Sequence, residues 1–273
     1  MNPYEQKVAV VTGGAGGLGG ALCAALADRR AVVIVADLDE AGAECVALEA
    51  RERRGRAEAC RVDVARADEL DTLVDEVVAR HGRLDYMFNV AGVAVIGEVR
   101  DITSVHWRSV LDVSLMGVVN GTTSAYRVMR AQGEGHIVNV ASLAGLIPFP
   151  TAAPYAAAKH AVVGLTSSLR SEAAGFGVRV TLVCPGFLET GFYDAAIVVR
   201  ARREDVLRWL PFRRMTPNRA AAVTLAGVAR NRRLIVFPRH ARLLWALGRL
   251  HPRLLDPFLA KAVRRFRRLR TEE

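Results

Sequence analysis

The chain has 273 residues, of which 51% are apolar, so it can bury the core of one large α/β domain or two small ones and is not a mainly disordered protein. No apolar run approaches the roughly 18 residues that cross a bilayer, and the first seven residues hold no signal segment, so neither secretion nor membrane spanning is predicted. The formal net charge is +10, but it is unevenly distributed. Residues 200–273 hold 20 basic and 5 acidic side chains, whereas residues 1–199 hold 18 basic and 23 acidic ones. This distribution excludes a basic surface over the whole fold.

Short apolar, β-branched runs alternate with longer stretches of helical period along the chain. Each short run is apolar on both faces, as strands covered by helices on both sides must be. This alternation predicts an α/β fold with a doubly wound parallel sheet of Rossmann type and about seven strands. The predicted strands are 8–11, 32–36, 59–62, 86–89, 136–140, 178–183 and 234–237, and the predicted helices lie near 17–29, 39–54, 66–81, 103–130, 153–174 and 217–230.

The sequence divides into a catalytic domain over residues 1–238, with a lid at about 187–216, and a basic amphipathic tail over residues 239–273. Pro252 and Pro257 are expected to break the tail into short helices. Two uses of the tail stay open: it lies on an anionic membrane surface, or it packs on the body or caps a neighbour's substrate pocket. The apolar residues at helical spacing are Leu243, Leu247, Leu250, Leu254, Phe258, Val263, Phe266 and Leu269.

A glycine-rich loop follows the first predicted strand and leads directly into a helix. Glycines let the backbone approach a pyrophosphate, which then lies at the helix N-terminus, although a glycine cluster alone also fits a flexible turn. Asp37 ends the second strand 18 residues after Gly19, where a carboxylate accepts both ribose hydroxyls and repels a 2′-phosphate. Neighbouring Leu38 and Asp39 bring no cation, so the sequence predicts NAD rather than NADP.

Further motifs follow the glycine loop and Asp37 in order along the chain, namely Asp63-Val64, Asn89-x-Ala91-Gly92, Ser142, Tyr155-x-x-x-Lys159 and Pro185-Gly186 with Thr190. With these motifs the chain resembles, from about residue 7 to residue 237, the single-domain short-chain dehydrogenases/reductases. A lone Tyr-x-x-x-Lys is common, but here it lies 13 residues after a serine that ends a strand and downstream of the cofactor motifs. The resemblance implies NAD contacts along the whole set of motifs. The implied cofactor residues are Thr12, Gly13, Gly17, Leu18, Gly19, Asp37, Leu38, Asp63, Val64, Asn89, Ala91, Gly92, Tyr155, Lys159, Pro185, Gly186, Leu188 and Thr190, and the implied catalytic residues are Ser142, Tyr155, Lys159 and Ser114.

Tyr155 and Lys159 are four residues apart on a predicted helix, so their side chains share a face. A nearby ammonium favours the ionised phenol and lowers its pKa, which makes Tyr155 a usable proton donor and acceptor. Ser142 is expected to hydrogen-bond the substrate oxygen while the cofactor takes the hydride. The predicted function is therefore an NAD-dependent oxidoreductase acting on a secondary alcohol or ketone.

Two positions depart from the family pattern. The family usually has Asn in the helix after the fourth strand, where Ser114 stands here, and a second Asn where Val90 stands. Ser114 is expected to keep a proton relay that runs through a backbone carbonyl, and Val90 to change packing more than activity. The alternative is a catalytically weak NAD-binding sensor or scaffold that has lost turnover at Ser114.

The lid carries aromatic residues, which favour an apolar substrate of lipid, steroid or terpenoid type unless they only pack the lid onto the body. Small residues on the Tyr155 helix, together with the resemblance, predict a dimer or tetramer. Four cysteines without C-x-x-C spacing indicate buried thiols in a reducing cytoplasm, and six histidines without metal spacing indicate no metal. The arginine-rich end lacks interleaved stacking aromatics, so no nucleic-acid partner is predicted. The lid aromatics are Phe192, Tyr193, Trp209 and Phe212, and the small residues are Ala156, Ala157, Ala158, Ala161 and Gly164.

Overall fold

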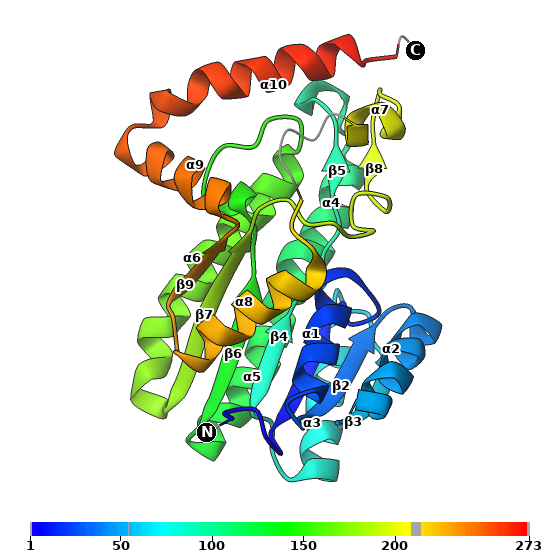
Figure 1. The fold of residues 1–273 in the computed structure, drawn as a ribbon, viewed down its shortest axis with the longest axis vertical. Helices are drawn as coiled ribbons and strands as arrows, with labels where there is room; N and C mark the ends of the chain where they lie inside the picture. The colour runs from blue at the N-terminus through cyan, green and yellow to red at the C-terminus, as the bar shows by residue number, and fades with distance from the viewer. Residues whose placement is uncertain (1, 54, 209–213, 272–273) are drawn as a thin grey trace.

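The computed structural model describes residues 2–53, 55–208 and 214–271. Its centre is a seven-stranded sheet with strand order β3-β2-β1-β4-β6-β7-β9, and every pair of neighbouring strands is parallel (Figure 1). The predicted doubly wound fold is confirmed. The strands are β1 (Val8–Thr12), β2 (Val32–Asp37), β3 (Arg56–Arg61), β4 (Tyr86–Asn89), β6 (Gly135–Val140), β7 (Val178–Pro185) and β9 (Leu234–Phe237).

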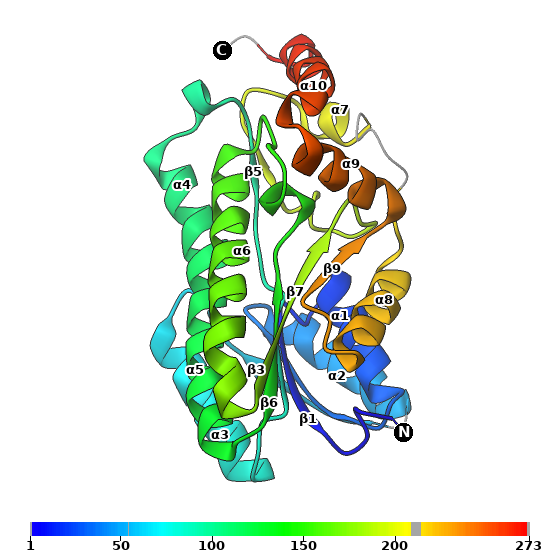
Figure 2. The ribbon, with the colours of Figure 1, turned by 90° about the vertical axis from the view of Figure 1, so that its left-hand side faces the viewer.

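Helices cover both faces of this sheet (Figure 2). On one face, α1 packs between α2 and α8, and on the other α5 lies beside α3 and α6. A buried apolar cluster fills the space between the sheet and each helix layer, which is why the central strands are apolar on both faces. These helices are α1 (Gly17–Ala27), α2 (Glu40–Arg53), α3 (Ala67–His81), α5 (Gly117–Gln132), α6 (Ala153–Ala173) and α8 (Pro217–Ala229).

The helix predicted over residues 103–130 is divided into three parts. It begins as α4 (Ser104–Leu111), passes through a π-helical turn (Asp112–Met116) and continues as α5. Such π-helical turns inside α-helices are frequent at functional sites, and this one contains Ser114. Short 3₁₀ segments cover Val99–Asp101, Leu143–Gly145 and Ala174–Phe176.

The lid forms a small structure of its own above the carboxyl ends of the strands. Its strand β8 (Ile197–Val198) pairs in parallel with β5 (Val95–Ile96), and α7 (Arg203–Arg208) follows. The two ends of the lid are joined by backbone hydrogen bonds, from Met215 to Phe187 and from Glu189 to Met215. The predicted lid aromatics Trp209 and Phe212 lie outside the described residues.

The tail packs on the body of its own chain. It consists of α9 (Arg239–Leu250), a 3₁₀ segment (Pro252–Leu255) and α10 (Asp256–Arg268). Leu255 and Phe266 are fully buried. As predicted, Pro252 separates two helices, but Pro257 lies in the first turn of α10, where a proline is tolerated, and does not break it. No helix within the described residues is long and apolar enough to cross a membrane.

The cysteine prediction is half right. Cys23 and Cys184 are buried thiols, but Cys45 is exposed on α2 and Cys60 is only half-buried on β3. Strand β3 is the edge of the sheet, so its side chains are covered less completely than those of the central strands. Free thiols are the state of all four cysteines in the structure.

Candidate active site

A cleft of about 870 Å³ lies at the carboxyl ends of the strands. It includes the point between β1 and β4 where the strand order reverses, which is where open α/β sheets bind their ligands. Its volume falls in the range of roughly 300–1,000 Å³ that is usual for small-molecule and cofactor sites. Residues from the glycine loop, from the ends of β2, β3, β4, β6 and β7, and from α6 and the lid line it.

The glycine loop needs its glycines for two different reasons. Gly17 begins α1 with a φ of 56°, a left-handed conformation that side chains disfavour. At Gly19 a Cβ atom would overlap the carbonyl oxygen of Gly13, so the helix can approach the loop only without a side chain. The start of α1 therefore borders the cleft with the backbone of Gly17 and Gly19 beside the Leu18 side chain, and amide groups at a helix N-terminus suit an anion.

Asp37 lies at the end of β2 and lines the cleft together with Leu38. Its carboxylate accepts hydrogen bonds from the Ala15 and Asp39 amides at 2.9 and 3.1 Å, which fixes its position beside the glycine loop. Among the described residues that line the cleft, Lys159 is the one cation, and it lies at the other end. Arg61 is in register with Asp37 on β3 but does not belong to the lining.

Most of the predicted site residues line this one cleft, and three do not. The side chains of Thr12, Asn89 and Ser114 lie behind its wall. The Thr12 hydroxyl accepts the amides of Val90 and Ala91 at 3.1 and 3.4 Å and so joins the ends of β1 and β4. The predicted residues that line the cleft are Gly13, Gly17, Leu18, Gly19, Asp37, Leu38, Asp63, Val64, Ala91, Gly92, Ser142, Tyr155, Lys159, Pro185, Gly186, Leu188 and Thr190.

Asn89 belongs to a buried polar network instead. Its amide donates to Asn139 Oδ1 at 2.8 Å and to Thr122 Oγ1 at 3.2 Å, and Asn139 in turn donates to Thr166 at 3.1 Å. These residues come from β4, β6, α5 and α6. The network therefore joins β4 and α5 to β6, which leads to Ser142, and to α6, which carries Tyr155 and Lys159, and it places the Asn89 side chain behind the cleft.

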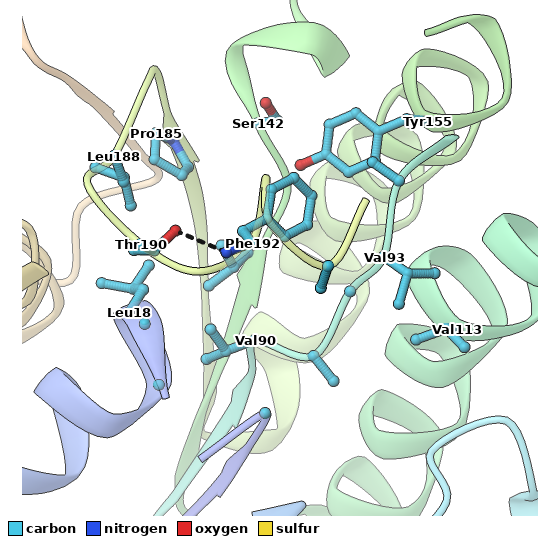
Figure 3. Close-up of a pocket in the computed structure, with 18 of the residues that line it drawn as sticks. Leu18, Val90, Val93, Val113, Ser142, Tyr155, Pro185, Leu188, Thr190 and Phe192 are labelled. Carbon is cyan, nitrogen blue, oxygen red and sulfur yellow. Dashed lines mark hydrogen bonds between the residues drawn. The ribbon is translucent and has the colours of Figure 1, made fainter. Parts of the chain in front are cut away.

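The three predicted catalytic side chains converge on one wall. Ser142 follows β6, and Tyr155 and Lys159 lie on α6. Figure 3 shows the Ser142 and Tyr155 hydroxyls facing the same part of the cleft. Lys159 is 2% exposed, its Nζ lies 5.6 Å from the centre of the Tyr155 ring, and it donates to the Val140 carbonyl at 3.0 Å.

Burial, and not the neighbouring ammonium, dominates the acid-base properties of this wall. Desolvation raises the pKa of Tyr155 to about 12, against the opposing effect of its hydrogen bond with Ser142. The expected lowering of the Tyr155 pKa by Lys159 is therefore wrong for the ligand-free chain. Desolvation also lowers the pKa of Lys159 to about 8. At neutral pH the phenol is protonated and can donate to a substrate oxygen.

Ser114 holds the backbone of Val93, which belongs to the wall of the cleft after β4. It is fully buried, and its hydroxyl donates to the Val93 carbonyl at 2.8 Å and accepts the Val93 amide at 2.9 Å. A Cβ atom on Gly92 would lie 3.4 Å from Ser114 Oγ and 3.5 Å from Lys159 Nζ, so both groups border the same backbone segment. Val90 lines the cleft.

The end of the cleft beside Tyr155 is aromatic. The Phe192 ring lies 5.6 Å from the Tyr155 ring and 5.4 Å from that of Tyr193 (Figure 3), and Phe187 stacks on Tyr193 at 6.3 Å and lies 6.1 Å from Phe149. Sequence reasoning found Phe192 and Tyr193 but missed Phe149. The sequence signal for Phe149 is the apolar stretch between Ser142 and Tyr155, which the fold brings back over the cleft.

Comparison with known protein families matches residues 7–197 to the short chain dehydrogenases. The chain belongs to the short-chain dehydrogenase/reductase family. The match ends within the lid, so the remainder of the lid, α8, β9 and the tail lie beyond the matched part of this dehydrogenase.

Individual relatives extend the similarity to nearly the whole chain. A putative oxidoreductase, SadH, of Mycobacterium tuberculosis is 34% identical over 271 residues, covering 97% of this chain and 98% of its own length. Cyclopentanol dehydrogenase of Comamonas is 34% identical over 190 residues, 70% of this chain and 76% of its own length. The crystal structure of a short-chain dehydrogenase/reductase from Burkholderia phymatum in complex with NAD has a TM-score of 0.86 at 29% identity and covers 93% of this chain and 96% of that one.

Proposed function

We propose that this short-chain dehydrogenase/reductase uses NAD to interconvert an apolar secondary alcohol and its ketone. The observation that carries the proposal is the convergence of Ser142, Tyr155 and Lys159 on one wall of a cleft whose other end holds the glycine loop and Asp37. The NAD complex of the Burkholderia structure and the cyclic alcohol in the name of the Comamonas relative support the same reaction class.

The residues at the cofactor end fit NAD. The glycine-rich start of α1 suits a pyrophosphate, and the half-buried Asp37 carboxylate suits two ribose hydroxyls. Asp37 and Asp39 are both negative at the place where a 2′-phosphate would lie. Lys159 would contact the nicotinamide ribose at the catalytic end, as the family resemblance implies. Bound there, NAD supplies the hydride acceptor, or the donor in its reduced form.

The chain's own residues manage the proton. Ser142 holds the substrate oxygen by a hydrogen bond, and Tyr155 donates a proton to that oxygen during ketone reduction or removes it during alcohol oxidation. A protonated phenol is the resting state at neutral pH, because burial raises its pKa to about 12. Lys159 and the backbone beside Ser114 form the path along which Tyr155 regains the proton that it has given to the substrate.

The shape and chemistry of the substrate end select for apolar molecules. Five aromatic rings border it, including that of Tyr155, and Lys159 is the one cation in the described lining. Burying a substrate carboxylate or phosphate without a partner would cost roughly several kcal/mol. Burying a ring or alkyl chain against the aromatic surface is instead favourable. Cyclic and long-chain secondary alcohols of lipid, steroid or terpenoid type therefore fit best.

The test is a substrate panel with the purified protein and NAD, in which reduced cofactor is followed by its absorbance. Hydrophobic secondary alcohols should be oxidised, and matched hydroxy acids of the same carbon skeleton should not. Tyr155→Phe serves as the control that removes only the hydroxyl. Turnover confined to hydroxy acids would contradict the substrate class, and equal turnover by Tyr155→Phe would contradict the mechanism.

We also infer self-association through α6 and a cytoplasmic place of action. Ala157, Ala161 and Gly164 are exposed at helical spacing on α6, and nothing lies within 4 Å of a Cβ atom placed on Gly164, so a second helix can approach closely. Ala158 is buried and leaves this face narrower than the sequence predicted. Light scattering at micromolar concentration should give a dimer or tetramer mass, and a monomer mass would contradict the inference.

The inferred cytoplasmic place of action is supported by the four free thiols, which fit a reducing compartment.

A further inference from the structure

The bend between α9 and α10 exposes large apolar side chains, which we call the elbow. It consists of Leu243, Leu250, Leu254 and Phe258, with exposed fractions of 60%, 79%, 50% and 37%. Leu243 and Leu250 are seven residues apart on α9 and so share a face, and Leu254 and Phe258 follow at intervals of four around the turn. Exposed large apolar residues elsewhere in the described chain are scattered over separate elements.

Basic side chains surround the elbow. Residues 239–271 contain ten arginines and lysines and one acid, Asp256. Arg267 forms an ion pair with Glu98, and Arg270 forms ion pairs with both Glu98 and Asp101. No carboxylate of the described chain lies within ion-pair distance of the exposed Arg253, Lys261 and Arg264, so their charge faces outward.

The tail is held at the same end of the molecule as the lid. Figure 1 shows α10 running beside α7, β5 and β8, far from the N-terminus. Backbone contacts fix this arrangement, since Thr271 donates to the Arg200 carbonyl and Arg270 bridges to Ala201 in the lid. These contacts hold the C-terminal end of α10 at the lid, and the elbow lies at the other end of this helix, which runs across the end of the molecule that carries the lid (Figure 1).

We propose that the elbow docks on an anionic lipid membrane. Apolar side chains bordered by outward-facing cations are the combination that inserts shallowly at the interface of such a membrane, because the leucines enter the acyl boundary while the arginines stay at the headgroups. Docking would place the cleft where apolar alcohols and ketones are concentrated. The binding itself does not depend on the proposed reaction and can fail or succeed without it.

Point variants test the proposal better than removal of the tail, because Leu255 and Phe266 are fully buried and truncation would uncover the core. The full chain is sedimented with vesicles of phosphatidylglycerol and phosphatidylcholine, with vesicles of phosphatidylcholine alone, and at low and high salt, without cofactor or substrate. We expect pelleting with the anionic vesicles, release by high salt and little pelleting with the neutral vesicles.

Two elbow variants and their controls complete the experiment. Leu250→Ser/Leu254→Ser should weaken binding at least about tenfold, since each leucine loses its burial in the membrane. Its control is Leu48→Ser, which removes a leucine that is 51% exposed on α2. Thermal unfolding shows whether each variant remains folded.

The charge variant is Arg253→Gln/Lys261→Gln/Arg264→Gln, which should weaken binding by about a hundredfold, at roughly fivefold for each charge. Its control, Arg56→Gln/Arg130→Gln/Arg232→Gln, removes three exposed charges near the amino-terminal ends of β3, β6 and β9, at the end of the sheet opposite to the lid. Absence of wild-type pelleting, or equal loss in control and elbow variants, would overturn the proposal. A third outcome would also overturn it: the wild type does not bind vesicles, and Leu250→Ser/Leu254→Ser loses the oligomer mass that the wild type shows. The elbow would then be a contact between copies of the chain.

Discussion

Ser114→Ala should loosen the wall of the cleft, and Ser114→Asn should not. The serine hydroxyl makes two hydrogen bonds to the backbone of Val93, of 2.8 and 2.9 Å, at a fully buried position. Each contributes about 0.5–1.5 kcal/mol, and stranding a buried partner costs about 1–3 kcal/mol. Because Val93 is partly exposed and water can replace some of the loss, we expect the free energy of unfolding to fall by about 2 kcal/mol, or roughly 4–8 °C in Tm.

The asparagine variant is the matched comparison, because its amide also offers one donor and one acceptor to the same backbone groups. Gly92 has no Cβ atom beside Ser114, which leaves room for the longer side chain. Denaturant unfolding measures the stability, and steady-state kinetics should show a higher KM for NAD in Ser114→Ala, since Gly92 and Val93 line the cleft. If Ser114→Ala unfolds like the wild type, or if Ser114→Asn is as unstable as Ser114→Ala, the reasoning is refuted.

Three further predictions concern single side chains. Tyr155→Phe should lower turnover about 10²- to 10⁴-fold while NAD affinity, measured by fluorescence titration, stays nearly unchanged, and retained turnover would count against its acid-base role. NAD should bind much more tightly than NADP, and Asp37→Ala should narrow the difference; tighter NADP binding to the wild type would contradict this. The pKa of Glu98 is lowered from 4.5 to about 2 by its arginine partners, Arg267 first, so its contribution to stability is full above pH 4.5 and is lost as the pH falls toward 2. Glu98→Gln should therefore reduce the denaturant midpoint at pH 6 but not near pH 2, and an equal reduction at both would argue against the ion pairs.

The sheet was predictable because its signal is local. The central strands are apolar on both faces, and this pattern located them. Edge strand β3 also contains charged residues, and it begins three residues before its predicted start. The π-helical turn around Ser114 left no such signal, because it depends on hydrogen bonds between one helix and a loop 21 residues away. The burial of Leu255 and Phe266 also depends on tertiary packing that the helical period of the tail could not reveal.

Spacing predicted which residues line the cleft better than it predicted what each does. The glycines, Asp37, Ser142, Tyr155 and Lys159 meet as the motifs indicated. Asn89 differs because the same polar residue at a strand end can face the cleft or the core, and only the positions of Asn139 and Thr122 decide which. The sign of the Tyr155 pKa shift was wrong because sequence shows which charge is near but not how much water is removed.

The attachment of Arg270 to Glu98 and Asp101, and of Thr271 to the lid, has a practical consequence for handling the protein. An affinity tag fused to the C-terminal end would emerge beside the lid, where it would disturb the contacts of Arg270 and Thr271 and stand near the entry to the cleft. The N-terminus lies at the opposite end of the molecule (Figure 1). Tagging there leaves the lid and the elbow as the chain folds them, and it is the arrangement in which kinetic and sedimentation measurements should be made.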